Sequence, residues 1–434
     1  MSRVTAGERF DVAVVGGGLA GLTAARELAA RGRRVVVLEA RDRLGGRAWF
    51  SSFAGTEVEM GGGFVHRIQP FIWSELERYG LDVVENPEPE RIFQRHDDGV
   101  EEAGPEAFAS FLASIETLCE GARTLIPDAK AIPTNDAARE ADRLSLRQKL
   151  DALDLSPEER DRLDALGSGL SSAPNDRAGF LLIAKSYALA DYGAELMLES
   201  NGRWTIARGT RALVDAIATD VDGEVRMNSV VHDISQRGSG VTIATDGGDI
   251  SAATAIVAVP LNTLGSIAFD PPLSPLKQEA AATGSVGLGV KVWATLSEEY
   301  PSSFATAPDR YPLTFAQTEA VTSDGRPLVL AFGPSAERLP LADHARVAAA
   351  IEEMLPGAKV DEVGGHDWVR DPYSRGTWAA YAPGTWLRWA PEFERPEGRI
   401  VFAGSDIARG WGSYMDGAIE TGLRAGREVE AILS

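Results

Sequence analysis

The sequence predicts an α/β protein in which a Rossmann-type domain is interleaved with a second domain of mixed β-sheet and helices. One observation is a β-α-β start that carries a glycine-rich turn, and another is a helical middle segment. The third is the return of β-like runs and a long helix afterwards, which gives each domain separate stretches of chain. A chain of 434 residues suits about two domains.

The first 47 residues carry the clearest pattern. Continuous apolar runs predict strands over 11–15 and 35–39, and apolar residues at helical spacing predict a helix over 19–31. This unit opens the domain that we expect to bind a dinucleotide. The expected limits of that domain are residues 1–85, 201–265 and 392–434.

The chain changes character near residue 87, where it becomes rich in Ala, Leu, Glu and Arg. Helical spacing predicts helices over 108–118, 144–155 and 157–166. Later segments predict strands over 225–234, 240–245, 255–259 and 399–403, and a final helix over 414–433. The expected limits of the substrate domain are residues 86–200 and 266–391.

Composition narrows the possible functions. The chain is 44% hydrophobic and 25% charged, and 43 basic against 64 acidic residues give a net charge of −21. This charge repels nucleic acids and anionic membranes, and no stretch approaches the ~20 apolar residues of a spanning helix. The single Cys119 allows no intrachain disulfide, and the five histidines lack metal-ligand spacing. We expect a cytoplasmic monomer or homodimer with no nucleic-acid, membrane or metal partner.

A glycine-rich turn lies between the first strand and the first helix. Gly16, Gly18 and Gly21 form G-x-G-x-x-G, and Glu39 follows Gly18 by 21 residues. In a Rossmann-type unit the first glycine permits a tight turn, the second leaves room for a pyrophosphate, and the third allows close helix packing. The helix N-terminus then faces the phosphates and Glu39 bonds the adenosine ribose.

The residues after Glu39 indicate which dinucleotide is bound. Leu44-Gly45-Gly46-Arg47 follows, and here the chain resembles the flavin-dependent amine oxidases of the monoamine oxidase type. That family places Gly-Gly-Arg just past the ribose-binding acid, with the arginine beside the FAD diphosphate. An arginine suits such a dianionic linker. The resemblance therefore implies FAD.

Further blocks extend the resemblance from residue 11 to residue 433, with no matching motif in about 86–200. They are residues 201–213, 230–231, 255–260 with 269–273, 401–406 and 411–418. The cofactor-binding residues implied by the resemblance are Gly16, Gly18, Leu19, Ala20, Gly21, Glu39, Ala40, Arg41, Gly46, Arg47, Gly62, Gly63, Phe64, Val231, Trp368, Gly404, Ser405, Asp406, Tyr414 and Met415. The last helix would aim its N-terminus at the flavin pyrimidine.

Amine oxidation by a flavin needs orientation and desolvation more than acid–base groups, so a cage is expected rather than a triad. Lys291 interrupts the apolar run 287–293, where a lysine is costly without a partner. By resemblance it holds a water against flavin N5; the alternative is a strand-edge lysine in solvent. Trp378 and Tyr414 match the two aromatic residues that face each other before the flavin in this family and form a cage that attracts amines. The alternative interpretation is that both side chains only pack in the core. One wall is thus tryptophan where monoamine oxidases carry tyrosine.

Three further positions bear on cofactor and substrate. Thr377 stands where monoamine oxidases carry the cysteine tethered to flavin, so we expect non-covalent FAD. His66 contacts substrate or flavin in one interpretation and solvent in the other, and substrate contacts are expected for His66, Trp378 and Tyr414. L-Amino acid oxidases carry an arginine near the position of Phe64 that binds the substrate carboxylate. Phe64 cannot bind a carboxylate, although Arg67 is close in sequence, so the L-amino acid oxidase alternative is disfavoured and stays open.

The resemblance and the site imply an FAD-dependent oxidase of a small hydrophobic or cyclic, alkaloid-type amine. Hydride would pass from the amine α-carbon to flavin N5, giving an imine that hydrolyses, and O2 would reoxidise the flavin with release of H2O2. The catalytic residues would be Lys291, Trp378 and Tyr414. Alternatives are an L-amino acid oxidase, a desaturating flavin oxidase of the same fold, an amine dehydrogenase with another electron acceptor, and a non-catalytic FAD-binding protein.

Overall fold

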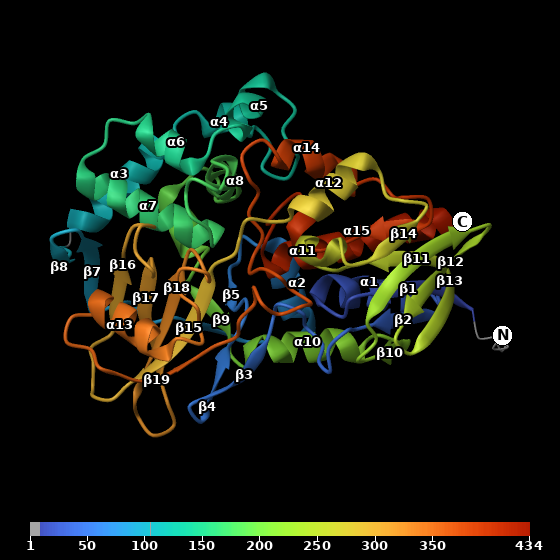
Figure 1. Ribbon diagram of the computed structural model, residues 1–434, viewed down its shortest axis with the longest axis horizontal. Coiled ribbons are helices and arrows are strands. Elements are labelled where there is room, and N and C mark those ends of the chain that lie inside the picture. Colours follow the sequence, from blue (N-terminus) through green and yellow to red (C-terminus); the bar gives the residue numbers. More distant parts are fainter. Residues whose placement is uncertain (1–8, 105) are drawn as a thin grey trace.

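The computed structural model describes residues 9–104 and 106–434 (Figure 1). An eight-stranded sheet with long helices forms one side of the molecule, and a seven-stranded sheet forms the other. A group of helices drawn in green stands above the seven-stranded sheet in this view. No helix within the described residues is both long and apolar enough to span a membrane.

The eight-stranded sheet is parallel at its centre. β1 (Phe10–Val15) pairs in parallel with β2 (Val35–Leu38) and β13 (Gly248–Val257), so that Val12 lies opposite Val35 and Thr254. All four residues of β2 are buried, as expected for a parallel strand covered on both faces. The other strands are β10 (Glu224–Arg226), β11 (Val231–Arg237), β12 (Gly240–Thr245), β14 (Ala268–Asp270) and β20 (Ile400–Phe402).

The predicted single strand over 225–234 is wrong, because the chain forms two strands there. β10 pairs with β2, whereas β11 pairs with β12. Between them Asn228 adopts φ 51°, in the left-handed region that asparagine tolerates. The amides of Asn228 and Ser229 donate to the carbonyls of Arg41 and Glu39. The pair Asn228-Ser229 is of the turn-forming type and was the available signal for this break.

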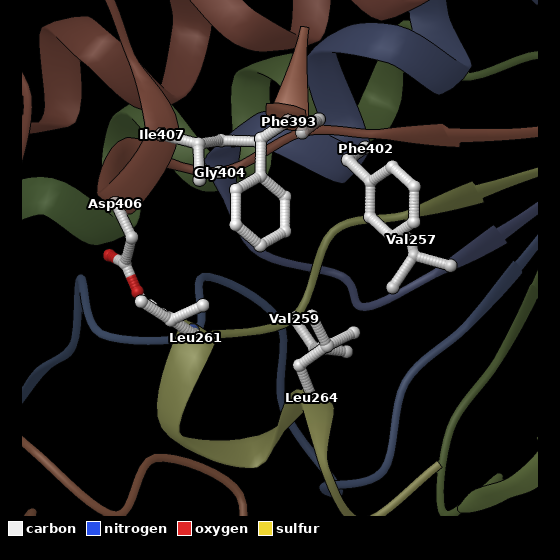
Figure 2. Close-up of a pocket in the computed structure, with 10 residues that line it drawn as sticks. Val257, Val259, Leu261, Leu264, Phe393, Phe402, Gly404, Asp406 and Ile407 are labelled. Atoms are coloured by element: carbon white, nitrogen blue, oxygen red, sulfur yellow. Dashed lines mark hydrogen bonds between the residues drawn. The ribbon is translucent and has the colours of Figure 1, made fainter. Parts of the chain in front are cut away.

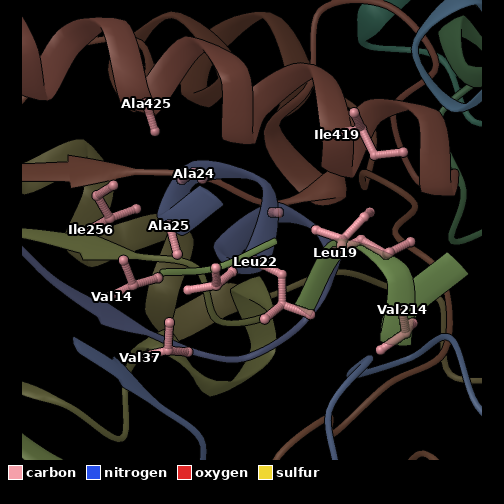
Figure 3. Close-up of a cluster of buried hydrophobic side chains, with 14 of the residues drawn as sticks. Val14, Leu19, Leu22, Ala24, Ala25, Val37, Val214, Ile256, Ile419 and Ala425 are labelled. Carbon is pink, nitrogen blue, oxygen red and sulfur yellow. The ribbon is translucent and has the colours of Figure 1, made fainter. Parts of the chain in front are cut away.

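Helices cover both faces of this sheet. α1 (Leu19–Ala29), α10 (Gly209–Thr219) and α15 (Met415–Leu433) lie on one face. α11 (Leu261–Leu264), α12 (Pro275–Thr283) and α14 (Trp386–Phe393) lie on the other. Figure 3 shows Val14, Leu22, Ile256 and Ile419 in the first layer. The predicted helices over 19–31 and 414–433 agree with α1 and α15 within two residues.

The seven-stranded sheet is mostly antiparallel. β15 (Val290–Leu296) pairs with β18 (Pro327–Gly333), and β18 pairs with β17 (Phe315–Val321). α13 (His344–Met354) covers one face, where it packs with Val292 and Ala294. The remaining strands are β7 (Arg91–His96), β8 (Gly99–Glu102), β16 (Ser303–Thr306) and β19 (Val360–Gly364).

The middle segment forms seven helices within its described residues. The predicted helices over 108–118, 144–155 and 157–166 correspond to α3, α6 and α7. The helices are α3 (Glu106–Leu118), α4 (Ala122–Leu125), α5 (Asp136–Asp142), α6 (Leu146–Asp151), α7 (Pro157–Ser171), α8 (Leu181–Leu189) and α9 (Ala194–Glu199). β14 lies beyond the expected limit at 265 yet pairs with β11, and the domain limits stay a prediction.

Short elements run between the two large sheets. β3 (Phe50–Phe53) and β4 (Thr56–Glu59) form a hairpin, and β5 (Phe64–Val65) pairs with β9 (Trp204–Ile206). The other elements are α2 (Pro70–Tyr79), β6 (Val83–Glu85) and the short helix η1 (Ser405–Ile407). The turn between β4 and β5 carries Gly61, Gly62 and Gly63, and the carbonyl of Gly61 accepts a hydrogen bond from Lys291 of the seven-stranded sheet.

Candidate active site

The glycine-rich turn after β1 is tied to Glu39. Gly16 has φ 106°, and its amide donates to the carbonyl of Leu38 at 2.8 Å. The Glu39 carboxylate is buried and accepts two backbone amides, from Gly17 at 2.7 Å and Arg41 at 2.9 Å. These bonds fix the carboxylate between the end of β2 and the start of α1.

Glycines of this region fall into two groups according to what surrounds them. A Cβ at Gly21 would lie 2.0 Å from the Gly16 carbonyl oxygen, and one at Gly61 would lie 1.8 Å from that of Arg47. At Gly18 and Gly62 the nearest heavy atoms would be 3.9 Å away. Packing therefore requires the first two glycines. The other two leave a backbone cradle that a side chain would fill, which suits a ligand that approaches the backbone closely.

The start of α1 adds backbone N–H groups to this cradle. Among the described residues no side chain caps the helix at Gly18, and its first turn contains no acidic residue. The amides of Leu19, Ala20 and Gly21 belong to this first turn, where helices leave backbone N–H groups without intrahelical partners. Such an N-terminus favours phosphate.

Arg47 joins three segments that are distant in sequence. Its Nη2 donates to Asp406, at short distance, and to the Ser405 hydroxyl at 3.1 Å. Its Nη1 donates to the carbonyl of Thr377 at 2.8 Å. Asp406 also accepts the amide of Leu261 at 2.9 Å, so this buried carboxylate holds the start of α11 against the arginine.

Arg43 is a residue of this region that the sequence reasoning missed. Its guanidinium lies 4.2 Å from the ring centre of Trp49 and 5.9 Å from that of Trp368. Burial lowers the pKa of Arg43 to about 10, and its buried Nη2 has no hydrogen-bond partner among the described residues. Its position two residues after Arg41 was the available signal.

The other expected cofactor residues occupy varied positions. Ala40 lies two residues beyond the end of β2. Val231 begins β11 two residues after Ser229, whose amide donates to the carbonyl of Glu39. Gly404 follows β20, and its amide donates to the hydroxyl of Thr421 at 2.9 Å. The buried Trp368 donates its indole N–H to the carbonyl of Met60 at 2.9 Å.

Gly46, Gly63, Phe64 and Met415 lie on the segments that border the cradle. Gly46 follows Gly45, which bridges to Gly18. Phe64 packs in an apolar cluster with Trp293 and Trp368, and Met415 begins α15 near Gly62.

Lys291 lies on β15 with 6% of its surface exposed, which excludes the solvent-facing alternative. Its Nζ donates to the carbonyl of Gly61 at 2.6 Å. Burial lowers the pKa of Lys291 to about 8, and Glu59 and Glu319 oppose that shift. The lysine is thus held against the 61–63 turn by a bond from one half of the molecule to the other.

The two expected cage aromatics have separate supports. The Trp378 ring meets Phe332 edge to face at 5.5 Å, and its indole N–H donates to Leu170 at 2.9 Å. The Tyr414 hydroxyl donates to Asn201 Oδ1 at 2.5 Å, and burial raises the pKa of Tyr414 to about 12.

A direct contact brings the two cage segments together, because the Ser413 hydroxyl donates to the carbonyl of Ala379 at 2.9 Å. The residues on either side of this contact are Trp378 and Tyr414. The sequence reasoning gave neither Phe332 nor Asn201 a role at the site. Phe332 carries no motif, and Asn201 opens the matched block 201–213, whose pattern does not reveal its contact with Tyr414.

Thr377 and His66 are both buried. The Thr377 hydroxyl lies 2.7 Å from the Ser172 hydroxyl and 2.9 Å from the carbonyl of Gly287. His66 is 3% exposed and stacks on Trp204 at 4.7 Å, which excludes a loop histidine in solvent. Its Nδ1 accepts the amide of Ile68, so the proton of the neutral ring is on Nε2.

His66 Nε2 has no partner among the described residues, and burial lowers the pKa of this histidine. Arg67, in contrast, stacks over the rings of Trp73 and Trp204 at 5.4 and 5.3 Å.

An apolar cavity lies beyond the ends of β13 and β20 (Figure 2). Its lining includes Val257, Leu264, Phe393 and Phe402, and Asp406 contributes a carboxylate at its edge. That carboxylate is already bonded to Arg47 and Leu261. The lining therefore suits packing of α11 and α14 against the sheet better than binding of a cation.

The chain matches the model of the flavin containing amine oxidoreductase family over residues 19–430. It belongs to that family. Nicotine dehydrogenase from Pseudomonas putida (strain DSM 28022 / S16) is 36% identical, over 100% of this chain and 91% of the relative. (S)-6-hydroxynicotine oxidase from Paenarthrobacter nicotinovorans is 32% identical, over 98% and 99%.

Solved structures agree with this family membership. The structure of putrescine oxidase bound to putrescine superposes with a TM-score of 0.85 at 25% identity, covering 98% of this chain and 99% of that one. Cyclohexylamine oxidase from Brevibacterium oxydans gives 0.82 at 20% identity, over 98% and 100%, which supports the fold alone. The predicted family and α/β fold are confirmed, and the protein is a flavin-containing amine oxidase.

Proposed function

We propose that this amine oxidase uses non-covalently bound FAD to oxidise a small hydrophobic or cyclic amine of the alkaloid type. The observation that carries the proposal is the bond from the buried Lys291 to Gly61, beside the open backbone of Gly62. This bond holds the lysine beside a turn of glycines. A turn without side chains leaves room for a flat cofactor ring to approach the backbone. Trp378 and Tyr414 flank the same region from adjoining segments.

The residues around the cradle fit FAD. Glu39 offers a carboxylate for ribose hydroxyls, and Gly18 with the start of α1 offers donors for a diphosphate. The unpartnered Nη2 of Arg43 and the guanidinium of Arg47 add positive charge. The other holding residues are Gly16, Leu19, Ala20, Gly21, Ala40, Arg41, Gly46, Gly62, Gly63, Phe64, Val231, Trp368, Gly404, Ser405, Asp406, Tyr414 and Met415.

When bound, the flavin supplies the acceptor for a hydride that leaves the amine α-carbon. The protein contributes orientation and exclusion of water. Trp378, braced by Phe332 and Leu170, and Tyr414, braced by Asn201, keep their rings in place for a neutral amine. In this proposal Lys291 holds a water molecule beside the flavin, as the family resemblance implies. The imine that leaves the site then hydrolyses in water.

The aromatic surroundings and the relatives support the substrate class. Curated relatives are named for nicotine, pseudooxynicotine and 6-hydroxynicotine. The unpartnered Nε2–H of His66 is a donor that a polar atom of the substrate could occupy. Arg67 stacks on Trp73 and Trp204, which disfavours it as a carboxylate receptor and weakens the L-amino acid oxidase alternative.

An amine dehydrogenase that passes its electrons to another acceptor is the second candidate. Two of the relatives are named dehydrogenases and a third is named an oxidase, so the family includes both types of enzyme. The candidates differ in the fate of the electrons. Oxygen as the acceptor predicts one H2O2 for each amine oxidised.

Anaerobic mixing of the purified holoenzyme with single amines tests the proposal. Nicotine, 6-hydroxynicotine, pseudooxynicotine, cyclohexylamine, putrescine and an L-amino acid set form the panel. A cyclic amine should bleach the flavin fastest, and readmitted air should restore the colour with H2O2. Bleached flavin that air does not reoxidise would favour the dehydrogenase, and no bleaching by any amine would contradict the proposal.

A further inference from the structure

The C-terminus of α7 lies against two segments that carry expected catalytic residues. The carbonyl of Leu170 accepts the indole N–H of Trp378 at 2.9 Å. A Cβ at Gly289, two residues before Lys291, would lie 2.3 Å from the hydroxyl oxygen of Ser172. One helix end therefore meets both the segment of Trp378 and the residues that lead into β15.

Two buried hydroxyls form a hydrogen-bond chain where these three segments meet. The Thr377 hydroxyl lies 2.9 Å from the carbonyl of Gly287 and 2.7 Å from the hydroxyl of Ser172. The carbonyl can only accept, and Thr377 has a single hydroxyl proton. Thr377 therefore donates to Gly287, because Ser172 is able to donate to Thr377 in turn. The Thr377 amide donates to the same carbonyl at 2.9 Å, so the chain joins α7, the segment 377–378 and the start of β15.

The backbone of Ser172 is in a conformation that serine rarely adopts. Its φ is 52° and its ψ is 36°, which is the left-handed region at the end of a helix. Glycine takes this conformation readily and is the common residue at such an end. Glycine has no hydroxyl, however, and could not form the bond to Thr377. The bond thus gives a physical reason for a serine at a position whose backbone favours glycine.

α7 is itself anchored to the loop between β16 and β17. The buried carboxylate of Asp164 accepts the amide of Asp309 at 2.7 Å and the side-chain amide of Asn175 at 2.9 Å. Arg147 of α6 lies 2.5 Å from the Asp164 carboxylate and 2.7 Å from that of Asp309. Asp309 belongs to the loop that leads into the seven-stranded sheet. The helix end that supports Trp378 is therefore fixed to the sheet that carries β15.

We propose that Ser172 is a positioning residue, whose hydroxyl holds Thr377 and thereby keeps Trp378 in place relative to Lys291. This inference rests on the proposed function, which gives Trp378 and Lys291 their roles. It also assigns a task to the helical segment 86–200, which matches no motif: through α7 it supports one aromatic wall of the site.

A double-mutant cycle on the thermal unfolding of the holoenzyme tests the hydroxyl chain without turnover. S172G removes one hydroxyl and suits the left-handed backbone, and T377V removes the other hydroxyl at a similar volume. The relief of backbone strain is the same in either background, so it cancels in the cycle. The double variant should lose less Tm than the sum of the single changes, because both substitutions remove the same bond. Additive changes would overturn the chain.

Ser168 provides the matched control for this cycle. It is a buried serine of the same helix, and its hydroxyl donates to the carbonyls of Asp164 and Ala165 within α7. The Tm changes of S168A and T377V should therefore add. The same non-additivity for S168A as for S172G would show a general effect of α7 and would overturn the specific bond.

Anaerobic flavin bleaching tests the link to the reaction, with the amine that bleaches the wild type fastest. S172G should raise the half-saturating amine concentration about fivefold, whereas S168A should leave it within about twofold. In a W378A background S172G should have no further effect, because the wall that Ser172 positions is gone. An equal effect of S172G in both backgrounds would overturn the positioning role. If no amine bleaches the wild type, the proposed function fails, and the Tm cycle still decides whether the hydroxyl chain exists.

Discussion

The Nζ atom of Lys291 lies 2.6 Å from the carbonyl oxygen of Gly61, and the two residues are 230 positions apart in the chain. This hydrogen bond connects β15 of the seven-stranded sheet to the turn between β4 and β5. A buried ammonium needs such an acceptor, since without one its burial would be strongly unfavourable. The bond therefore fixes where the lysine stands relative to the glycine turn.

Replacing Lys291 with methionine should slow flavin reduction or reoxidation by more than about tenfold, or about 1.4 kcal/mol. Methionine fills a similar volume among Trp293 and Phe332 but offers no donor. Stopped-flow absorbance of the flavin measures both half-reactions. Lys359→Met at an exposed position is the control, and wild-type rates in Lys291→Met would refute the assigned role.

The two groups of glycines predict opposite phenotypes for alanine. Gly18→Ala should leave the fold intact, because its Cβ meets no atom closer than 3.9 Å and its φ is −77°. It should weaken flavin binding, since the methyl group fills the cradle. Gly21→Ala should instead destabilise the protein by about 1–3 kcal/mol, because its Cβ would lie 2.0 Å from the Gly16 oxygen.

Flavin content and thermal unfolding of flavin-stripped protein separate these effects. Gly18→Ala should lose flavin at nearly wild-type Tm, and Gly21→Ala should lose Tm. If stripped Gly18→Ala unfolds as early as Gly21→Ala, the cradle is a packing feature and not a ligand site.

Local patterns predicted much of the fold. β1, α1 and β2 follow from apolar runs and glycine spacing, and the Glu39 position follows from the turn. The turn at Asn228 escaped because its signal is only the short pair Asn228-Ser229 between two apolar runs. Local sequence patterns therefore predict helices and strands well, but they predict short turns between adjacent strands poorly.

Site residues could be predicted where a short sequence pattern reveals them. Contacts between residues that are distant in the chain could not. Lys291 was visible as a charge in an apolar run. Its bond to the Gly61 carbonyl was not visible, because the two residues are 230 positions apart in the chain. Asn201 escaped for the same reason, since its contact with Tyr414 spans 213 positions.

The bond from Tyr414 to Asn201 predicts how the aromatic wall is held. Asn201→Leu should leave the phenol without its acceptor, at a cost of about 1–3 kcal/mol in unfolding free energy, and should raise KM for the amine. Tyr414→Phe keeps the ring and should change flavin reduction less than tenfold, whereas Tyr414→Ala should exceed tenfold. Equal rates for the phenylalanine and alanine variants would show that the ring itself is dispensable.

Thr377 predicts how the cofactor is attached. A threonine hydroxyl cannot form a thioether, and here it is occupied by Ser172 and Gly287. The single Cys119 is buried in the helical segment, where burial raises its pKa to about 12 and keeps it a thiol. Acid precipitation should therefore release the flavin into the supernatant, where its mass should identify FAD. Yellow colour that stays with the washed pellet would mean a covalent bond and would overturn the non-covalent assignment. Cys119→Ser, which removes the one thiol, should release flavin to the same extent as the wild type.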